Sequence, residues 1–140
     1  MIKATDGHQQ KHKDGTMLAD IKAIQTHAFI KATPEGRLNR ANMKKLFMDI
    51  ASAAATSGDC GILIDTRKAQ SGMSSSDLWY LAAQLSKLGK AFSRKTAVIC
   101  PRERFDRVGF FALCAQNRGF LVNVFTSFED AIEWLMAEGP

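Results

Sequence analysis

The apolar positions of this chain alternate between short continuous runs and longer stretches with helical spacing. The first helical stretch begins after Asn39, which is placed as an N-cap, and ends before Gly58. Its apolar residues recur three, four and seven positions apart, as on one buried helix face. They are Met43, Leu46, Phe47, Ile50 and Ala54. This pattern predicts an amphipathic helix over about residues 39–57.

The same spacing predicts three further helices. The second follows the serines at 74–76, the third spans about 103–118, and the fourth opens at residues 127–130. Their apolar stripes are Leu78, Leu81, Leu85 and Leu88 in the second, Phe105, Val108, Ala112 and Ala115 in the third, and Ala131, Trp134 and Leu135 in the fourth. A glycine follows each helix, as expected where the chain leaves a last turn in a left-handed conformation. These glycines are Gly58, Gly89, Gly119 and Gly139.

The short apolar runs are typical of β-strands. Residues 61–65 (GILID), 96–100 (TAVIC) and 120–125 (FLVNVF) lie between the helices, and the first two fit strands covered on both faces. Before the first helix, MLADIKAI and HAFIKAT, separated by Gln25-Thr26, predict a hairpin. Pro34-Glu35-Gly36 predicts a turn after it.

Strands that alternate with helices are joined by right-handed crossovers, which make a sheet largely parallel. We therefore expect an α/β fold, a small sandwich of a mostly parallel sheet with an N-terminal antiparallel hairpin and about four helices. A chain of 140 residues is long enough for one hydrophobic core. We expect a single domain over residues 17–140 after a polar, mobile N-terminal extension over residues 1–16.

Composition narrows the class of protein. The hydrophobic fraction of 46% and the charged fraction of 24% are those of an ordinary globular chain. The N-terminus lacks the apolar core of a secretory signal, so we expect a cytoplasmic protein. Within the cytoplasm, the two options are a protein free of the membrane and one bound peripherally to it. The net charge of +5 favours acidic partners. Cys60, Cys100 and Cys114 show neither disulfide nor zinc spacing and are expected to be buried free thiols.

Several of these elements together resemble a known family. The hairpin, a helix entered through GRLN, a strand ending in LIDTR, a serine-rich helix start, the strand TAVIC and the final VFTSFEDAIEWL resemble the SpoIIAA-like proteins. This family is related to the STAS domain of anti-sigma factor antagonists and has been compared with lipid-binding domains of the Sec14/CRAL-TRIO type. The resemblance covers about residues 17–138. It implies a STAS-like fold and a binding or regulatory role.

In the anti-sigma antagonists the helix after this strand begins with an Asp-Ser-Ser-Gly-like motif, and one serine there is phosphorylated. The matching positions read Met73-Ser74-Ser75-Ser76, so the acid and the glycine of that motif are replaced. The resemblance makes Ser75, and next Ser74, the candidate phosphorylation sites. Ser74 and Asp77 also have the spacing of a capping box. The sequence leaves both interpretations open, a helix cap and a phosphorylation switch.

No catalytic motif is recognisable. Parallel sheets usually bind ligands at the carboxyl ends of their strands, where Asp65, Thr66, Arg67, Cys100, Arg102, Thr126 and Ser127 are expected. The loop CPRERFDR nevertheless has Asp106 where a Cys-x5-Arg phosphate loop needs arginine, and it lacks glycine. The histidines form no triad pattern, and dinucleotide and Walker motifs are missing from the sequence. We therefore expect no enzyme activity, no cofactor and no metal site.

The basic segment over residues 87–107 and the third helix suggest a ligand. The segment contains seven lysines and arginines against two acids, which is commonly a solvated face but also suits anionic lipid headgroups. Nucleic acid ranks below lipid because the expected sheet lacks an RNP-like aromatic signature. The third helix is apolar on more than one side, as in a buried helix, a partner surface or a pocket wall. Its apolar residues also fit a homodimer contact.

We predict a non-enzymatic binding or regulatory module for a small apolar or amphipathic molecule such as a lipid, with a membrane surface as one setting. The candidate ligand-binding residues are Phe105, Phe110 and Phe111 for the apolar part, Arg102, Arg104 and Arg107 for an anionic group, and Asp65 and Arg67 at a strand end. The alternative is a protein-interaction switch of the anti-sigma-antagonist type, controlled by phosphorylation of Ser75 or Ser74.

Overall fold

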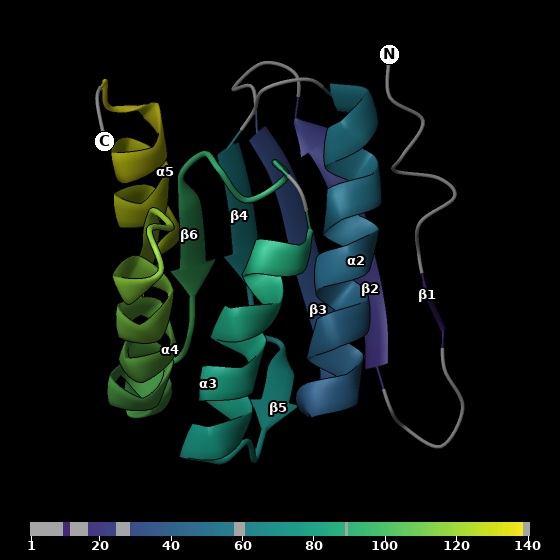
Figure 1. Cartoon of the computed structure of the whole chain (residues 1–140), viewed down its shortest axis with the longest axis vertical. Coiled ribbons are helices and arrows are strands. Elements are labelled where there is room, and N and C mark those ends of the chain that lie inside the picture. The colour runs from purple at the N-terminus through teal and green to yellow at the C-terminus, as the bar shows by residue number, and fades with distance from the viewer. Residues whose placement is uncertain (1–9, 12–16, 25–28, 58–60, 89, 139–140) are drawn as a thin grey trace.

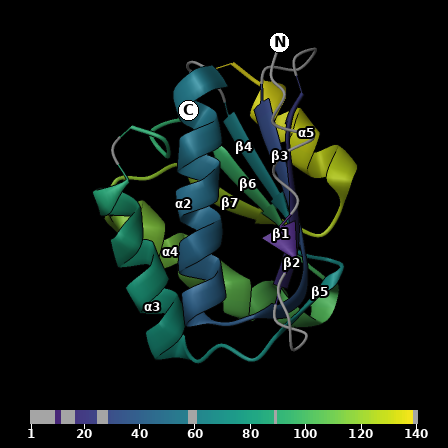
Figure 2. The ribbon, with the colours of Figure 1, turned by 90° about the vertical axis from the view of Figure 1, so that its right-hand side faces the viewer.

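The structure is a computed structural model that describes residues 10–11, 17–24, 29–57, 61–88 and 90–138. These residues form a central sheet with helices on both faces (Figures 1 and 2). The predicted α/β sandwich is confirmed, because most strand pairs are parallel and an antiparallel hairpin stands at the N-terminal side. None of the helices within these ranges is both long and apolar enough to cross a membrane.

In the described part of the chain, seven strands form one sheet in the order β1-β2-β3-β4-β6-β7, with β5 paired to β3. The β1, β2 and β3 strands pair antiparallel, and all the other pairs are parallel. The strands are β1 Gln10–Lys11, β2 Met17–Ile24, β3 Phe29–Leu38, β4 Gly61–Asp65, β5 Ala69–Ser71, β6 Thr96–Ile99 and β7 Val122–Phe125. The rest of the expected N-terminal extension, apart from β1, lies outside the described residues.

Four α-helices lie within the described ranges. They are α2 Arg40–Ser57, α3 Ser75–Gln84, α4 Phe105–Asn117 and α5 Phe128–Met136. Short 3-10 turns continue α3 at Leu85–Lys87 (η2) and precede α4 at Arg102–Arg104 (η3). Helices α2, α3 and α4 cover one face of the sheet and α5 covers the other, as Figure 2 shows.

Each face of the sheet has its own core, since successive side chains of a strand point to opposite faces. On β4, Ile62 and Ile64 pack into the larger core under α2, α3 and α4, whereas Leu63 packs into the smaller core under α5. The ring of Phe47 on α2 lies 5.5 Å from that of Phe92 and 6.0 Å from that of Phe111 on α4. This aromatic cluster joins α2 to α4 across the larger core.

The helix ends confirm most of the predicted capping. The Asn39 side chain accepts a hydrogen bond from the amide of Asn42 at 2.8 Å, and Ser127 accepts one from Asp130 at 3.1 Å. Gly119 leaves α4 with a positive φ of 93°. The other predicted closing glycines, at positions 58, 89 and 139, lie outside the described residues.

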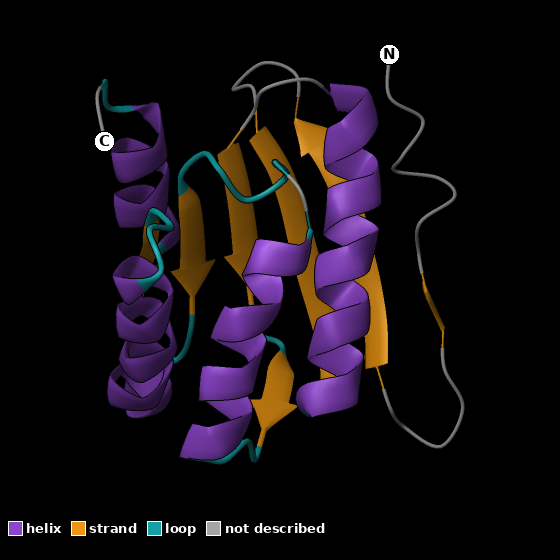
Figure 3. Ribbon diagram, in the orientation of Figure 1, coloured by secondary structure: helices purple, strands orange, loops and turns teal. Residues whose placement is uncertain are grey.

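The predicted turn at Pro34-Glu35-Gly36 is wrong, because β3 runs through it to Leu38. One side of β3 pairs with β2. The other side pairs with β4 up to Ala32 and with β5 from Gly36 onward, so on that side Pro34 falls in the interval between the two strands. A proline is tolerated there, where a strand lacks a neighbour to receive its missing N–H. The three-residue strand β5, which lies beyond the end of β4 in Figure 3, was not predicted.

Candidate functional site

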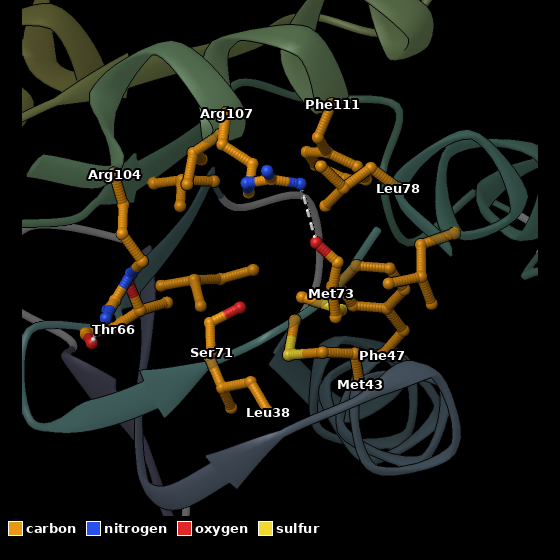
Figure 4. Close-up of a pocket in the computed structure, with 14 residues that line it drawn as sticks. Leu38, Met43, Phe47, Thr66, Ser71, Met73, Leu78, Arg104, Arg107 and Phe111 are labelled. Atoms are coloured by element: carbon orange, nitrogen blue, oxygen red, sulfur yellow. Dashed lines mark hydrogen bonds between the residues drawn. The ribbon is translucent and has the colours of Figure 1, made fainter. Parts of the chain in front are cut away.

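A small cavity lies at the carboxyl ends of β3, β4 and β6, beneath α2, α3 and α4 (Figure 4). Its lining residues are Leu38, Met43, Phe47, Ile64, Thr66, Ser71, Met73, Leu78, Leu81, Val98, Arg104, Arg107, Val108 and Phe111. Its volume is about 50 Å³. Because a bound water needs about 10–15 Å³ on this scale, the cavity has room for roughly four non-hydrogen atoms.

Two predicted arginines stand at the rim of this cavity. Arg104 donates a hydrogen bond from Nη2 to the carbonyl of Thr66 at 2.8 Å, and Arg107 donates one from Nη1 to the carbonyl of Met73 at 2.7 Å. These bonds tie the start of α4 to the loops that follow β4 and β5. The third predicted arginine, Arg102, is exposed and is not part of the lining.

The predicted aromatic residues of α4 separate into two groups. Phe111 is 8% exposed and packs in the core, where it also forms part of the cavity wall. Phe105 and Phe110 are 42% and 37% exposed and do not line the cavity. Placing Phe105 on the core face of this helix was therefore wrong. The helix is apolar on several sides, so its spacing alone did not identify the buried one.

Asp65 and Arg67 form an ion pair with each other at the end of β4. Two hydrogen bonds, from Nε and Nη2 of Arg67 to the two carboxylate oxygens, measure 2.9 and 2.8 Å. Burial of Asp65 raises its pKa, but the hydrogen bonds and the charge of Arg67 outweigh that effect, and the pKa lies below its usual value. Neither residue lines the cavity, so this pair stabilises the loop after β4.

Ser74 and Asp77 form the complete capping box of α3. The amide of Asp77 donates to Ser74 Oγ at 3.1 Å, and the amide of Ser74 donates to Asp77 Oδ2 at 3.0 Å. The hydrogen bond from the Ser74 amide lowers the pKa of Asp77, and the Arg40 guanidinium 3.0 Å away acts in the same direction. Ser75 is exposed as the first residue of α3, and no side-chain hydrogen bond of Ser75 is found within the described residues. Cap and candidate modification site are thus adjacent residues.

The outer side of α3 and α4 exposes large apolar side chains. We define the α3–α4 surface as Ser75, Trp79, Phe110 and Leu113. Trp79 is 54% exposed and Leu113 53%, and the guanidinium of Arg118 lies 5.1 Å from the centre of the Trp79 ring. Sequence reasoning missed Trp79, although its position between Leu78 and Leu81, off the leucine stripe, already indicated an exposed aromatic residue. Large exposed apolar residues on two neighbouring helices are candidates for an interaction surface.

The remaining candidates for chemistry are structural. Cys100 is fully buried, and burial raises the pKa of its thiol, which makes it a poor nucleophile. Cys114 is half-buried, contrary to prediction, and Cys60 lies outside the described residues. Within the described ranges, no group of three or more His, Cys, Asp or Glu side chains is arranged to hold a metal ion.

Comparisons with known proteins bear on the fold. No family model and no curated protein matches the chain. An anti-sigma factor antagonist from Mycobacterium paratuberculosis has a similar solved structure, with a TM-score of 0.61 at 17% identity over 91% of this chain and 100% of that chain. An uncharacterised DUF3478-family protein with a SpoIIAA-like fold from Shewanella loihica has a TM-score of 0.57 at 20% identity over 90% and 98% of the two chains. The chain therefore has the SpoIIAA-like fold that its sequence resembles.

Proposed function

We propose that the protein is a regulatory module that acts by binding a partner protein, as an anti-sigma factor antagonist does. The observation that carries this proposal is the N-terminal end of α3. Ser75 is exposed there, one helical turn before the exposed Trp79, in a fold shared with an anti-sigma factor antagonist. The partner is expected to cover the α3–α4 surface, with the Trp79 side chain as its main anchor, because buried aromatic residues dominate binding energy at interfaces.

Ser75 is the better of the two candidate phosphorylation sites. The hydroxyl of Ser74 already accepts the hydrogen bond that caps α3, so a phosphate there would displace the cap. A phosphate on Ser75 would leave the cap intact and would lie at the positive end of the helix dipole. Arg107 is a positively charged neighbour, since it donates to the carbonyl of Met73 two residues earlier. Phosphorylation of Ser75 is therefore compatible with the folded state.

Phosphorylation is expected to weaken partner binding. It adds a charge of about −1.5 to −2 beside an apolar contact, where the charge must lose water when the partner docks. The unmodified protein is then the binding form and the phosphorylated protein the released form.

The test begins with protein carrying an affinity tag, isolated from its native cells under several growth conditions. Mass spectrometry of its peptides should find phosphate on Ser75, and a specific co-purifying protein should be identified. Ser75→Glu and Trp79→Ala should each reduce its recovery at least tenfold, whereas Ser75→Ala should retain it. Ser52→Glu and Met48→Ala are matched controls, because both positions are exposed and lie on α2 and not on α3 or α4.

Two results would contradict the proposal. One is equal recovery of the partner with Ser75→Glu and Ser52→Glu, which would separate binding from the start of α3. The other is a bare Ser75 under every growth condition, together with unchanged binding by Trp79→Ala.

The lipid-binding interpretation has weaker support than the protein-binding one. Phe111 belongs to the core, and a cavity of about 50 Å³ is too small to enclose an acyl chain of ordinary length. The exposed Phe105 and Phe110 are separate from that cavity. A lipid bound in the cavity would therefore leave these two rings uncovered. Binding of a partner protein accounts better for the exposed aromatic residues.

A further inference from the structure

The cavity at the carboxyl ends of the parallel strands has two chemically different parts. Its interior is formed by aliphatic and aromatic side chains from the sheet, α2, α3 and α4, including Phe47, Leu78 and Phe111. Its rim carries two arginines, and Figure 4 shows the Ser71 side chain directed into the space between them and the opposite wall. The surface of the interior is almost entirely apolar, and the guanidinium groups lie at its edge, where they donate to backbone carbonyls. Small-molecule sites are commonly apolar, with a few polar groups that fix the orientation of the ligand.

The two rim arginines have unused hydrogen-bonding capacity. Arg104 and Arg107 each donate one hydrogen bond to a backbone carbonyl, which holds the guanidinium at the rim. A guanidinium has five N–H donors, so further donors remain on both. Within the described residues neither arginine is in an ion pair, because the nearby acids Asp65 and Asp77 pair with other arginines. The rim thus carries two positive charges that are held in place and that have no ion-pair partner in the described part of the chain.

We propose that this cavity binds a small molecule with a short hydrocarbon body and one carboxylate. The hydrocarbon body enters the apolar interior, and the carboxylate accepts hydrogen bonds from Arg104, Arg107 and the Ser71 hydroxyl. Charge-assisted bonds from arginine to carboxylate are the strongest class available to the protein. The volume of about 50 Å³ limits the buried part to roughly four carbon atoms. The lining contains none of the four residues of the α3–α4 surface. Arg107 also lies near Ser75, and carboxylate binding is therefore tested on the unmodified protein without a partner.

The methionines of the chain provide an internal reporter. Met43 and Met73 line the cavity, whereas Met48 and Met136 are each 50% exposed and lie elsewhere. We would label the methionine methyl groups with carbon-13 in the full chain and record NMR spectra during titration with acetate, propionate, butyrate, valerate, hexanoate and octanoate. Met43 and Met73 should shift in a saturable manner and Met48 and Met136 should not. Affinity should rise about fourfold per methylene up to valerate and then level off, because further carbons stay in water.

The contribution of the charge is tested with variants and with a neutral ligand. Arg104→Gln and Arg107→Gln should each weaken butyrate binding about tenfold, since each removes a charged donor. Arg102→Gln is the matched control, because Arg102 lies at the same turn and is not part of the lining. Butanol should bind wild type and variants alike and more weakly than butyrate. Unchanged methyl spectra before titration show that the variants are folded.

Three results would overturn the proposal. Equal shifts at all four methionines, or no saturable shift at all, would mean that the cavity binds none of these carboxylates. Equal affinity for butanol and butyrate would leave an apolar cavity without a role for the arginines. A loss of binding in Arg102→Gln as large as in Arg107→Gln would show that overall charge, and not the rim, attracts the anion.

Discussion

The adjacent serines at the start of α3 allow the structural and the regulatory interpretations to be separated by measurement. In the Ser74→Ala variant the amide of Asp77 loses the oxygen that accepts from it at 3.1 Å, whereas the reciprocal bond to the backbone of Ser74 remains. Loss of such a cap costs about 1 kcal/mol. Ser75 has no side-chain hydrogen bond in the described structure, so Ser75→Ala should change the free energy of unfolding by less than about 0.5 kcal/mol.

Urea denaturation followed by circular dichroism measures both variants against wild type. With a slope of about 2 kcal/mol per molar urea, the loss in Ser74→Ala should lower the midpoint by about 0.5 M. The corresponding change in Tm is about 4 °C for a chain of this size. The double variant Ser74→Ala, Asp77→Asn should cost less than the sum of the two single variants, because both residues belong to one capping box.

Equal stability losses in Ser74→Ala and Ser75→Ala would refute this reasoning. So would an unchanged midpoint in Ser74→Ala. Equal losses would mean that Ser75 contributes as much to the helix start as the cap does, and an unchanged midpoint would mean that the cap does not stabilise α3. In both cases stability would give no reason to prefer Ser75 over Ser74 as the modified residue. The outcome described above would leave Ser75 as the residue that can be modified without loss of the helix start.

Three further predictions test the core, the strand-end ion pair and the helix end. Phe111→Ala should cost about 3–5 kcal/mol by thermal or chemical unfolding, whereas Phe110→Ala, at an exposed site, should cost less than about 1 kcal/mol. The lowered pKa of Asp65 means that its carboxylate contributes stability above its unfolded pKa of about 4 and loses it as the pH falls through the lower folded pKa. Arg67→Met should therefore begin acid unfolding at a higher pH, and NMR titration of Asp65 should show a raised pKa. Gly119→Ala should cost about 1–2 kcal/mol in urea denaturation, because its φ of 93° strains any residue with a side chain.

The role of Phe111 also affects how the ligand hypotheses can be tested. A serine at this position would disturb the aromatic contact with Phe47 as well as any binding site, so loss of binding in such a variant would not distinguish the two effects. Substitutions at the rim avoid this difficulty. Arg104 and Arg107 are tied to carbonyls at the cavity edge and contribute little to the hydrophobic core.

The sequence alone determined the features that arise within single elements. The 3.6-residue period and the caps at Asn39, Ser74 and Ser127 placed the helices, because a helix end needs a local acceptor for its free amides. The continuous apolar runs at residues 61–65 and 96–100 identified strands buried on both faces. Alternation of these elements was sufficient for the parallel sheet, since right-handed crossovers leave few other arrangements.

The tertiary structure decided what depends on neighbours from distant parts of the chain. Ala69–Ser71 became a strand because the end of β3 was available to pair with it. Pro34 remained inside β3 because neither β4 nor β5 pairs with it on the side away from β2. The choice between Phe105 and Phe111 as a core residue of α4 depended on where α2 and the sheet lie. The same packing brought Arg104, Arg107 and Ser71 to one cavity rim, a proximity that no local sequence signal contains, because only the folded chain places α4 beside the loop after β5.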